Sequence, residues 1–179
     1  MQLVIELPDW LADLNRDPRR LDPDAAMRLA ISTAERNIDC GGGPFGAVMV
    51  DADGALISVG ANRVIASHAS FLHAEMLALL LAQQKLGTHD LSSQGTLTLY
   101  STCEPCAMCL GALPFSGIAE LICGAHEADA RRAGFDEGAK PHDWITALQQ
   151  RGISVTTGFH HDAAADTLRR YRSIGGSLY

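Results

Sequence analysis

The stretch TLTLYSTCEPCAMCLGAL, residues 96–113, changes from strand-like to helix-like sequence within a few positions. Its first seven residues are rich in Thr, Leu and Tyr, and this composition predicts a strand. Pro105 disfavours the helical conformation of the preceding Glu104 and itself suits the first turn of a helix. The sequence therefore predicts a strand that passes directly into a helix, with the helix N-cap near Glu104.

Strand and helix patterns also alternate along the rest of the chain. Asp22 is a suitable N-cap, and Pro23 a favourable first residue, for a helix over residues 23–38. Two short apolar runs, 45–51 and 55–62, flank a turn-forming Asp-Ala-Asp-Gly and predict a β-hairpin. The remaining expected elements are helices at 70–87, 127–134, 143–152 and 161–173 and strands at 118–125 and 153–159.

This order of elements predicts an α/β fold. After the opening hairpin, strands alternate with helices, which is typical of a largely parallel sheet covered by helices on both faces. We expect a three-layer α/β/α sandwich around a mixed five-stranded sheet, formed by a single domain over residues 23–179. Residues 1–22 are rich in Pro, Asp and Arg and are expected to form an irregular N-terminal arm.

The composition restricts the possible functions. The chain is 47% hydrophobic and 20% charged, as globular proteins are, and no apolar run is long enough to span a membrane. Five cysteines without a signal-peptide pattern predict a reducing, cytoplasmic location and no disulfide framework. The net charge of −7 and the scattered arginines argue against a nucleic-acid partner.

Metal-ligating residues lie at the starts of two predicted helices. Cys106 and Cys109 are three residues apart, which places both thiols on one helix face, one turn apart. A helix N-terminus also stabilises thiolates. His73 and Glu75 open the other helix, and H-x-E…P-C-x-x-C is the signature of zinc deaminases. One histidine and two cysteines leave the fourth position of Zn²⁺ for water, and Glu75 is then placed to act as general acid and base.

Two other interpretations of the cysteines stay open. A Cys-x-x-Cys pair also occurs in redox sites and in structural zinc sites. Cys103 could complete such a structural site as a fourth ligand, and Glu75 would then be dispensable. The combined pattern of His73-Ala-Glu and of a proline directly before Cys106 is more specific than either half. It favours catalytic zinc over a non-catalytic zinc or redox module.

From about Pro23 to Tyr179, its last residue, the chain resembles guanine deaminases of the cytidine-deaminase-like superfamily. The segment AGFDEG resembles guanine deaminases and not the tRNA deaminases, which share the other segments in looser form. The segments that carry the resemblance are GGPFGAV (42–48), NRV (62–64), HAEMLAL (73–79), CEPCAMCLGA (103–112) and AGFDEG (133–138).

The resemblance implies a role for each matched residue, beyond the zinc ligands His73, Cys106 and Cys109. Glu75 and Glu137 would be the catalytic carboxylates. Asn62 would hydrogen-bond the purine edge, and Phe45 would pack against the base. Further substrate contacts are implied at Ala74, Phe115, Asp136 and Tyr179, of which the last would close the site of its own chain or of a partner subunit.

The implied reaction is hydrolytic deamination of guanine at C2, which gives xanthine and ammonia. Zn²⁺ is the implied cofactor, the partner is a small nucleobase, and the implied assembly is a homodimer. One departure is Phe115, which stands where some guanine deaminases have a tryptophan. Related substrates stay open as alternatives, namely guanosine, an aminotriazine, cytosine and adenosine in tRNA.

Overall fold

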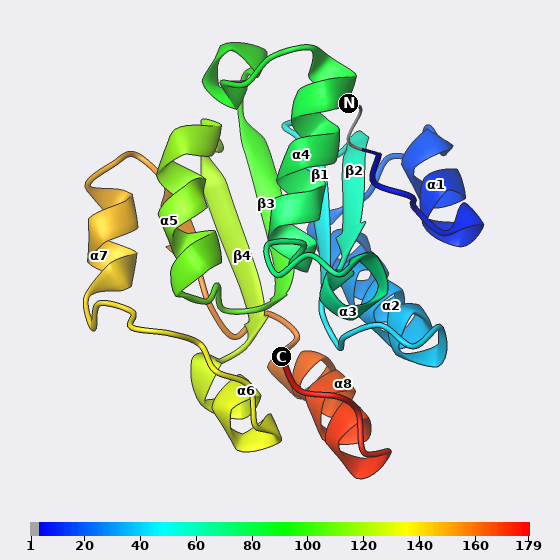
Figure 1. Ribbon diagram of the computed structural model, residues 1–179. Coiled ribbons are helices and arrows are strands. Elements are labelled where there is room, and N and C mark those ends of the chain that lie inside the picture. Colours follow the sequence, from blue (N-terminus) through cyan, green and yellow to red (C-terminus); the bar gives the residue numbers. More distant parts are fainter. Residues whose placement is uncertain (1–3) are drawn as a thin grey trace.

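A five-stranded sheet forms the middle layer of the computed structural model, which describes residues 4–179 (Figure 1). β1 is antiparallel to both of its neighbours, β2 and β3, whereas β3, β4 and β5 are parallel. The mixed sheet expected from the sequence is therefore confirmed. The strands, in their order across the sheet, are β2 (Leu56–Ala61), β1 (Gly46–Asp51), β3 (Leu97–Cys103), β4 (Glu120–Ala125) and β5 (Ser154–Thr156).

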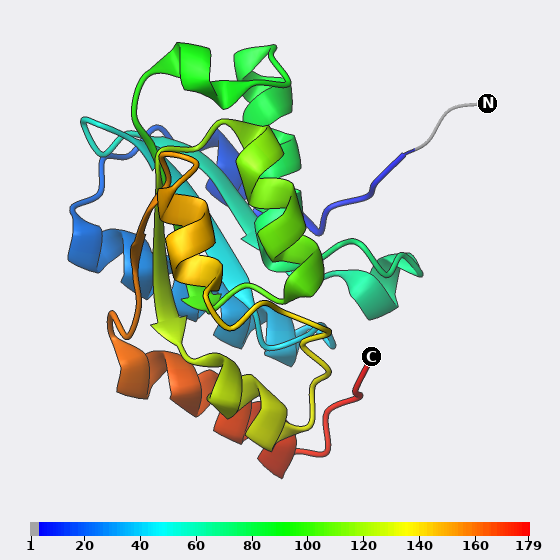
Figure 2. The same cartoon turned by 90° about the vertical axis from the view of Figure 1, so that its left-hand side faces the viewer.

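Helices cover both faces of the sheet, as Figure 2 shows with α2 and α8 on one side and α5 and α7 on the other. Alternate residues of β1 enter the two cores: Val48 and Val50 face α2, whereas Ala47 and Met49 face α4. The helices are α1 (Asp9–Arg16), α2 (Pro23–Asp39), α3 (Val64–Ser67), α4 (Ala74–Leu86), α5 (Ala107–Ser116), α6 (Glu127–Ala133), α7 (Trp144–Gln149) and α8 (His161–Ser173), with a 3₁₀ turn, η1, at Leu91–Gln94.

The N-terminal segment differs from the irregular arm expected for residues 1–22. It contains helix α1, whose Trp10 and Leu11 are buried in the core shared with α2. The side chain of Asn15 pairs with the backbone of β2, donating to Val59 O at 2.9 Å and accepting from Val59 N at 2.8 Å. The Pro, Asp and Arg residues that surround these buried apolar residues hid the helical pattern of the segment in the sequence. Residues 1–3 lie outside the described part of the chain.

Helix α5 begins two residues later than expected. Cys106 is its N-cap, and Glu104 remains in the extended segment that follows β3. Glu104 is held there because its N–H donates to Ala125 O at 2.9 Å and its carboxylate accepts from Glu127 N at 3.0 Å. These contacts with the end of β4 and the start of α6 compete with helix capping. The short helix α3 was not expected from the sequence.

Gly60 on β2 allows the first turn of α4 to lie directly on the sheet. A Cβ atom at this position would lie 2.6 Å from Ala78 N and would overlap the carbonyl oxygen of Ala74. Because Gly60 has no side chain, α4 can approach the sheet closely. This approach sets the distance between the sheet and His73, the residue that precedes α4. None of the helices within residues 4–179 is long and apolar enough to cross a membrane.

Candidate active site

Three ligand atoms from two distant segments meet beyond the end of β3. Cys106 Sγ and Cys109 Sγ lie 3.5 and 3.6 Å from His73 Nδ1. Tetrahedral Zn²⁺, with bonds of about 2.3 Å to sulfur and about 2.05 Å to nitrogen, separates a sulfur from a nitrogen by about 3.6 Å. The three side chains therefore fit a zinc ion as they stand. Among residues 4–179 no fourth ligand joins this group.

Two helix N-termini point at this group, because His73 and Cys106 are the N-cap residues of α4 and α5. The free N–H groups and the dipole of each helix favour negative charge on the ligands. The neighbouring Cys109 thiol, followed by His73, lowers the pKa of Cys106 to about 4. The same neighbouring Cys106, together with burial, raises the pKa of Cys109. A bound dication would favour the thiolate form of both cysteines.

Cys103 lies outside the ligand group. It is the last residue of β3 and is buried, and its Sγ lies 3.7 Å from His126 O. Burial raises the pKa of Cys103 well above its ordinary value, which disfavours the thiolate that a metal would bind. The structure therefore argues against a closed site with Cys103 as fourth ligand.

Two buried carboxyl groups accompany the ligands. Glu75 in the first turn of α4 is 6% exposed, and Glu137 in the loop after α6 is 5% exposed. Burial, with the negative charge of Cys106 second, raises the pKa of both groups, that of Glu137 to about 7. The raised pKa brings Glu137 into the range in which a carboxyl group exchanges protons near neutral pH, and the pKa of Glu75 is shifted in the same direction.

The loop that carries Glu137 is tied to the start of α5. Ala107 N donates to Glu137 O at 2.9 Å. Lys140, almost fully buried, donates from Nζ to Pro105 O at 3.1 Å and pairs with Glu127 at 2.8 Å. These bonds fix the second carboxylate relative to the cysteine ligands, although the two segments are about thirty residues apart.

Aromatic rings form the other wall of the pocket. Phe45, from the glycine-rich loop before β1, packs edge-on against Phe135 at a centroid distance of 4.9 Å. Phe135 also contacts Tyr179, at 5.4 Å, and Tyr171, at 5.9 Å. Sequence reasoning missed Phe135 as a site residue, although it lies in the AGFDEG segment. An apolar residue between polar ones, beside two candidate carboxylates, was the available signal.

The C-terminal Tyr179 lies among the residues that line this pocket. Only about 20 Å³ of free volume is left among the ligands, the carboxylates and the rings, which is room for about one water molecule. The Tyr179 ring reaches Gly43, where a Cβ atom would overlap its hydroxyl oxygen and lie 3.0 Å from Asn62 Oδ1. Within residues 4–179, Tyr179 Oη and Asn62 Nδ2 are both buried without a hydrogen-bond partner. Asn62 is not itself among the residues that line the pocket and lies beside Tyr179 at Gly43. Its amide N–H would find a partner in a ligand that takes the place of the Tyr179 ring.

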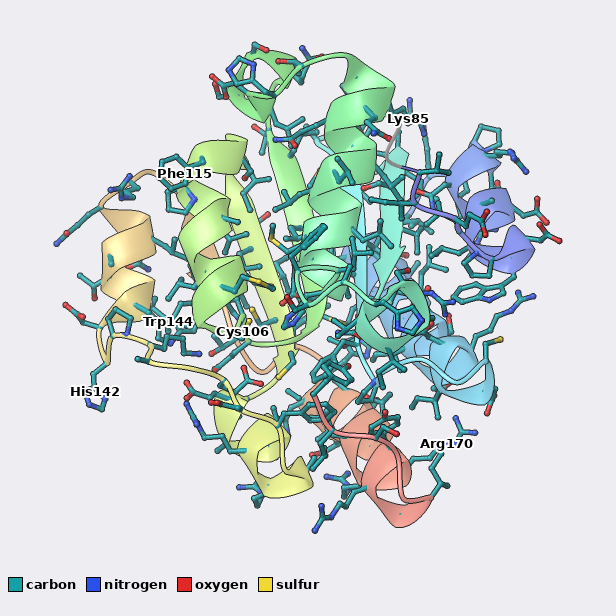
Figure 3. All side chains as sticks on the ribbon, in the orientation of Figure 1. Lys85, Cys106, Phe115, His142, Trp144 and Arg170 are labelled. Carbon is teal, nitrogen blue, oxygen red and sulfur yellow. The ribbon has the colours of Figure 1, made fainter. Side chains whose placement is uncertain are left out.

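The other expected substrate contacts are placed differently. Asp136 and Glu104 both line the pocket, and Asp136 Oδ1 also accepts from Gly138 N at 2.9 Å. The Ala74 methyl group is buried in the core against the sheet. Phe115 lies at the end of α5 remote from Cys106 and is 80% exposed, so the structure does not bring it to the pocket of its own chain (Figure 3).

Comparisons with known proteins agree with this geometry. Residues 22–125 match the model of the cytidine and deoxycytidylate deaminase zinc-binding region. A solved structure of guanine deaminase from Nitrosomonas europaea superposes with a TM-score of 0.94 at 44% identity, covering 96% of this chain and 97% of that one. Guanine deaminase of Bacillus subtilis is 38% identical over 118 residues, 65% of this chain and 73% of its own length. The tRNA-specific adenosine deaminase of Haemophilus influenzae is 37% identical over 132 residues, 74% and 72% of the two chains.

Zinc content distinguishes the buried cysteines that bind the metal from those that do not. The Cys106→Ala variant is expected to lose most bound zinc, because two ligands hold the ion far more weakly than three. The matched variant Cys103→Ala is expected to keep one zinc per chain and to lose only about 1 kcal/mol of stability from the small cavity. Metal analysis of both purified proteins is the measurement, and zinc loss from Cys103→Ala alone would contradict the assignment.

Proposed function

The chain belongs to the cytidine and deoxycytidylate deaminase family of zinc-dependent enzymes, and we propose that its substrate is guanine. It hydrolyses the bond between C2 and the amino group and releases xanthine and ammonia. The observation that carries this proposal is the second buried carboxylate, Glu137, in the same pocket as Glu75 and the metal ligands. It lies in the AGFDEG segment, which separates guanine deaminases from tRNA deaminases in the resemblance described above.

Proton transfer is the task of the two carboxyl groups. A Zn²⁺ ion held by the histidine and the two cysteines supplies Lewis-acid activation of water. Glu75 takes a proton from that water and delivers it to ring N3 as the oxygen bonds to C2. The proton of the new C2 hydroxyl group then passes through Glu75 or Glu137 to the amine, which leaves as ammonia. The raised pKa of each carboxyl group, caused chiefly by burial, supports this role.

Polar and aromatic groups on the opposite side of the pocket recognise the purine. Asn62 offers an amide N–H that has no partner within residues 4–179, and a purine carbonyl or ring nitrogen would satisfy it. Phe45 supplies an aromatic surface for the base, and Phe135, which also lines the pocket, packs edge-on against it. Asp136 stands at the same rim and accepts hydrogen bonds.

Tyr179 covers the bound base. In this structure its ring occupies the space between Phe135 and Asn62, so the C-terminal segment moves aside for guanine and closes over it afterwards. A pocket closed in this way favours a free base over a base within tRNA, because a polynucleotide could not be enclosed. The closing segment also excludes water from the site, which strengthens the electrostatic interactions inside it.

An apolar surface between α4 and α5 supports a homodimer. Phe115 and Phe71 are exposed large rings, 80% and 48% respectively. They border a groove of about 470 Å³ that Leu72, Met76 and Leu80 also line. A protruding ring beside an apolar groove is self-complementary under twofold symmetry, and contiguous exposed apolar surface of this kind is typical of interfaces. The free thiols that the metal site needs support a reducing, cytoplasmic location.

Ammonia release from single bases tests the reaction. The zinc-loaded protein is expected to release ammonia from guanine and not from guanosine, cytosine or adenine. Glu75→Ala is expected to keep its zinc and to lose turnover by at least about 10²-fold, because the proton carrier is gone. Release from another base alone would contradict the substrate proposal, and near-normal turnover of Glu75→Ala would contradict its catalytic role.

Substitution of the last residue tests the closing segment. Tyr179→Ala is expected to lower kcat/KM for guanine about tenfold, because the base loses an aromatic contact and its shield from water. Tyr179→Phe keeps the ring and removes a hydroxyl group without a partner, so it serves as the matched control and is expected to stay within about twofold. Unchanged or higher kcat/KM in Tyr179→Ala would mean that the segment only obstructs the pocket.

A charge on the apolar surface tests the dimer. Phe115→Glu is expected to shift the protein from dimer to monomer in analytical ultracentrifugation, because the interface would bury an unpaired carboxylate. Ile174→Glu is the matched control, since Ile174 is 59% exposed just after α8, outside this surface. A Phe115→Glu protein that sediments as the wild type does would place the interface elsewhere.

A further inference from the structure

Asn37, on the pocket side of α2, is a fully buried polar residue that the mechanism does not use. Its side-chain Nδ2 donates two hydrogen bonds to backbone carbonyls, at 2.8 Å to Gly43 O and at 2.7 Å to Asn62 O. These acceptors are 6 and 25 residues away along the chain. A single amide group therefore joins two segments that approach the pocket separately.

Arg63 fixes which way the amide of Asn37 points. Its Nη1 donates to Asn37 Oδ1 at 3.0 Å. Because a guanidinium group has only donors, the atom that faces it must be the oxygen, and the two N–H groups then face the carbonyls. All three hydrogen bonds agree with this single orientation. Asn37 Oδ1 and Nδ2 are thus both satisfied, as a buried amide requires.

The two carbonyls belong to the segments that carry the proposed purine contacts. Gly43 lies two residues before Phe45, and Asn62 is the residue proposed to bind the purine edge. Asn62 N also donates to Phe45 O at 3.1 Å, which closes a small network around the pocket wall. The loop at Gly42 leaves no space for another arrangement, since a Cβ atom there would overlap the side chain of Asn37.

We propose that Asn37 is a positioning residue for purine recognition, which holds Asn62 and the Phe45 loop at the separation that guanine requires. This inference rests on the proposed function. Asn37 itself does not line the pocket and acts only through the two segments that it joins. Loss of its amide lets the two segments separate, so both contacts to the base weaken together, whereas the metal ligands and Glu75, on α4 and α5, keep their places.

The chain contains a matched control for this role. The Asn15 side chain also makes three hydrogen bonds, one within its own helix, at 2.8 Å to Leu11 O, and two to the sheet, at 2.9 Å to Val59 O and at 2.8 Å from Val59 N. It lies on α1, outside the pocket. A residue that only stabilises the fold and a residue that positions the site therefore lose the same number of hydrogen bonds when each is replaced by alanine.

The experiment compares zinc-loaded Asn37→Ala and Asn15→Ala. Both are expected to have a lower Tm. For Asn37→Ala, KM for guanine is expected to rise about tenfold, with kcat and zinc content within about twofold, because uniform binding is lost. For Asn15→Ala, KM is expected to stay within about twofold. Equal KM values in the two variants, or a loss confined to kcat, would overturn the proposal.

Two further measurements keep the test decisive. In the Glu75→Ala background, calorimetry reads guanine binding without turnover, and Asn37→Ala is expected to raise Kd by a similar factor. If Asn37→Ala does not fold, Arg63→Met, which removes only the orienting bond, is expected to raise KM about threefold. An unchanged KM in Arg63→Met would then overturn the proposal.

If the wild type turns over a base other than guanine, the proposed function fails, and the same comparison with that base decides the role of Asn37.

Discussion

The convergence of two helix N-termini on one metal site is the constraint on which the rest of the structure depends. α4 and α5 each begin at a ligand residue, His73 and Cys106, so their free N–H groups and dipoles reinforce the charge of the ligand set. Both helices lie on the same face of the sheet. The parallel pairing of β3 with β4 and the close approach of α4 to Gly60 bring their first turns together. Small shifts in either helix would change all ligand distances at once.

The pocket brings together ionisable groups whose burial is energetically unfavourable. Two thiols and two carboxyl groups share one buried region, and the raised pKa values of Glu75 and Glu137 reflect loss of hydration first and repulsion by Cys106 second. A dication offsets part of this cost, as does the nearby ammonium group of Lys140. Such arrangements are typical of sites where proton transfer depends on carboxyl groups that titrate near neutral pH.

The opposite wall is assembled from three segments that are far apart in the sequence. The loop before β1 contributes Phe45, the loop after α6 contributes Phe135, and the last residue, Tyr179, packs against both regions. Buried amide and ammonium groups hold these loops, with Asn37 on one side and Lys140 on the other. The metal ligands and Glu75 thus lie at helix starts, whereas Glu137 and the proposed substrate contacts lie on segments that polar side chains fix to the scaffold.

The sequence alone determined the parts of this protein that depend on local chemistry. The mixed sheet, most of its helices and the pairing of Cys106 with Cys109 followed from periodicity, capping and ligand spacing, which act over a few residues. His73 joined the cysteines through the match to the zinc-deaminase signature. Only the tertiary structure decided the parts that depend on contacts between distant segments. Glu104 bonds to the end of β4 and the start of α6 instead of capping α5, α1 folds because the core accepts Trp10, and Phe115 faces outward. Packing also brought Phe135 into the pocket and Asn37 against the loops that carry Gly43 and Asn62, and no local pattern encodes a contact between segments far apart in sequence.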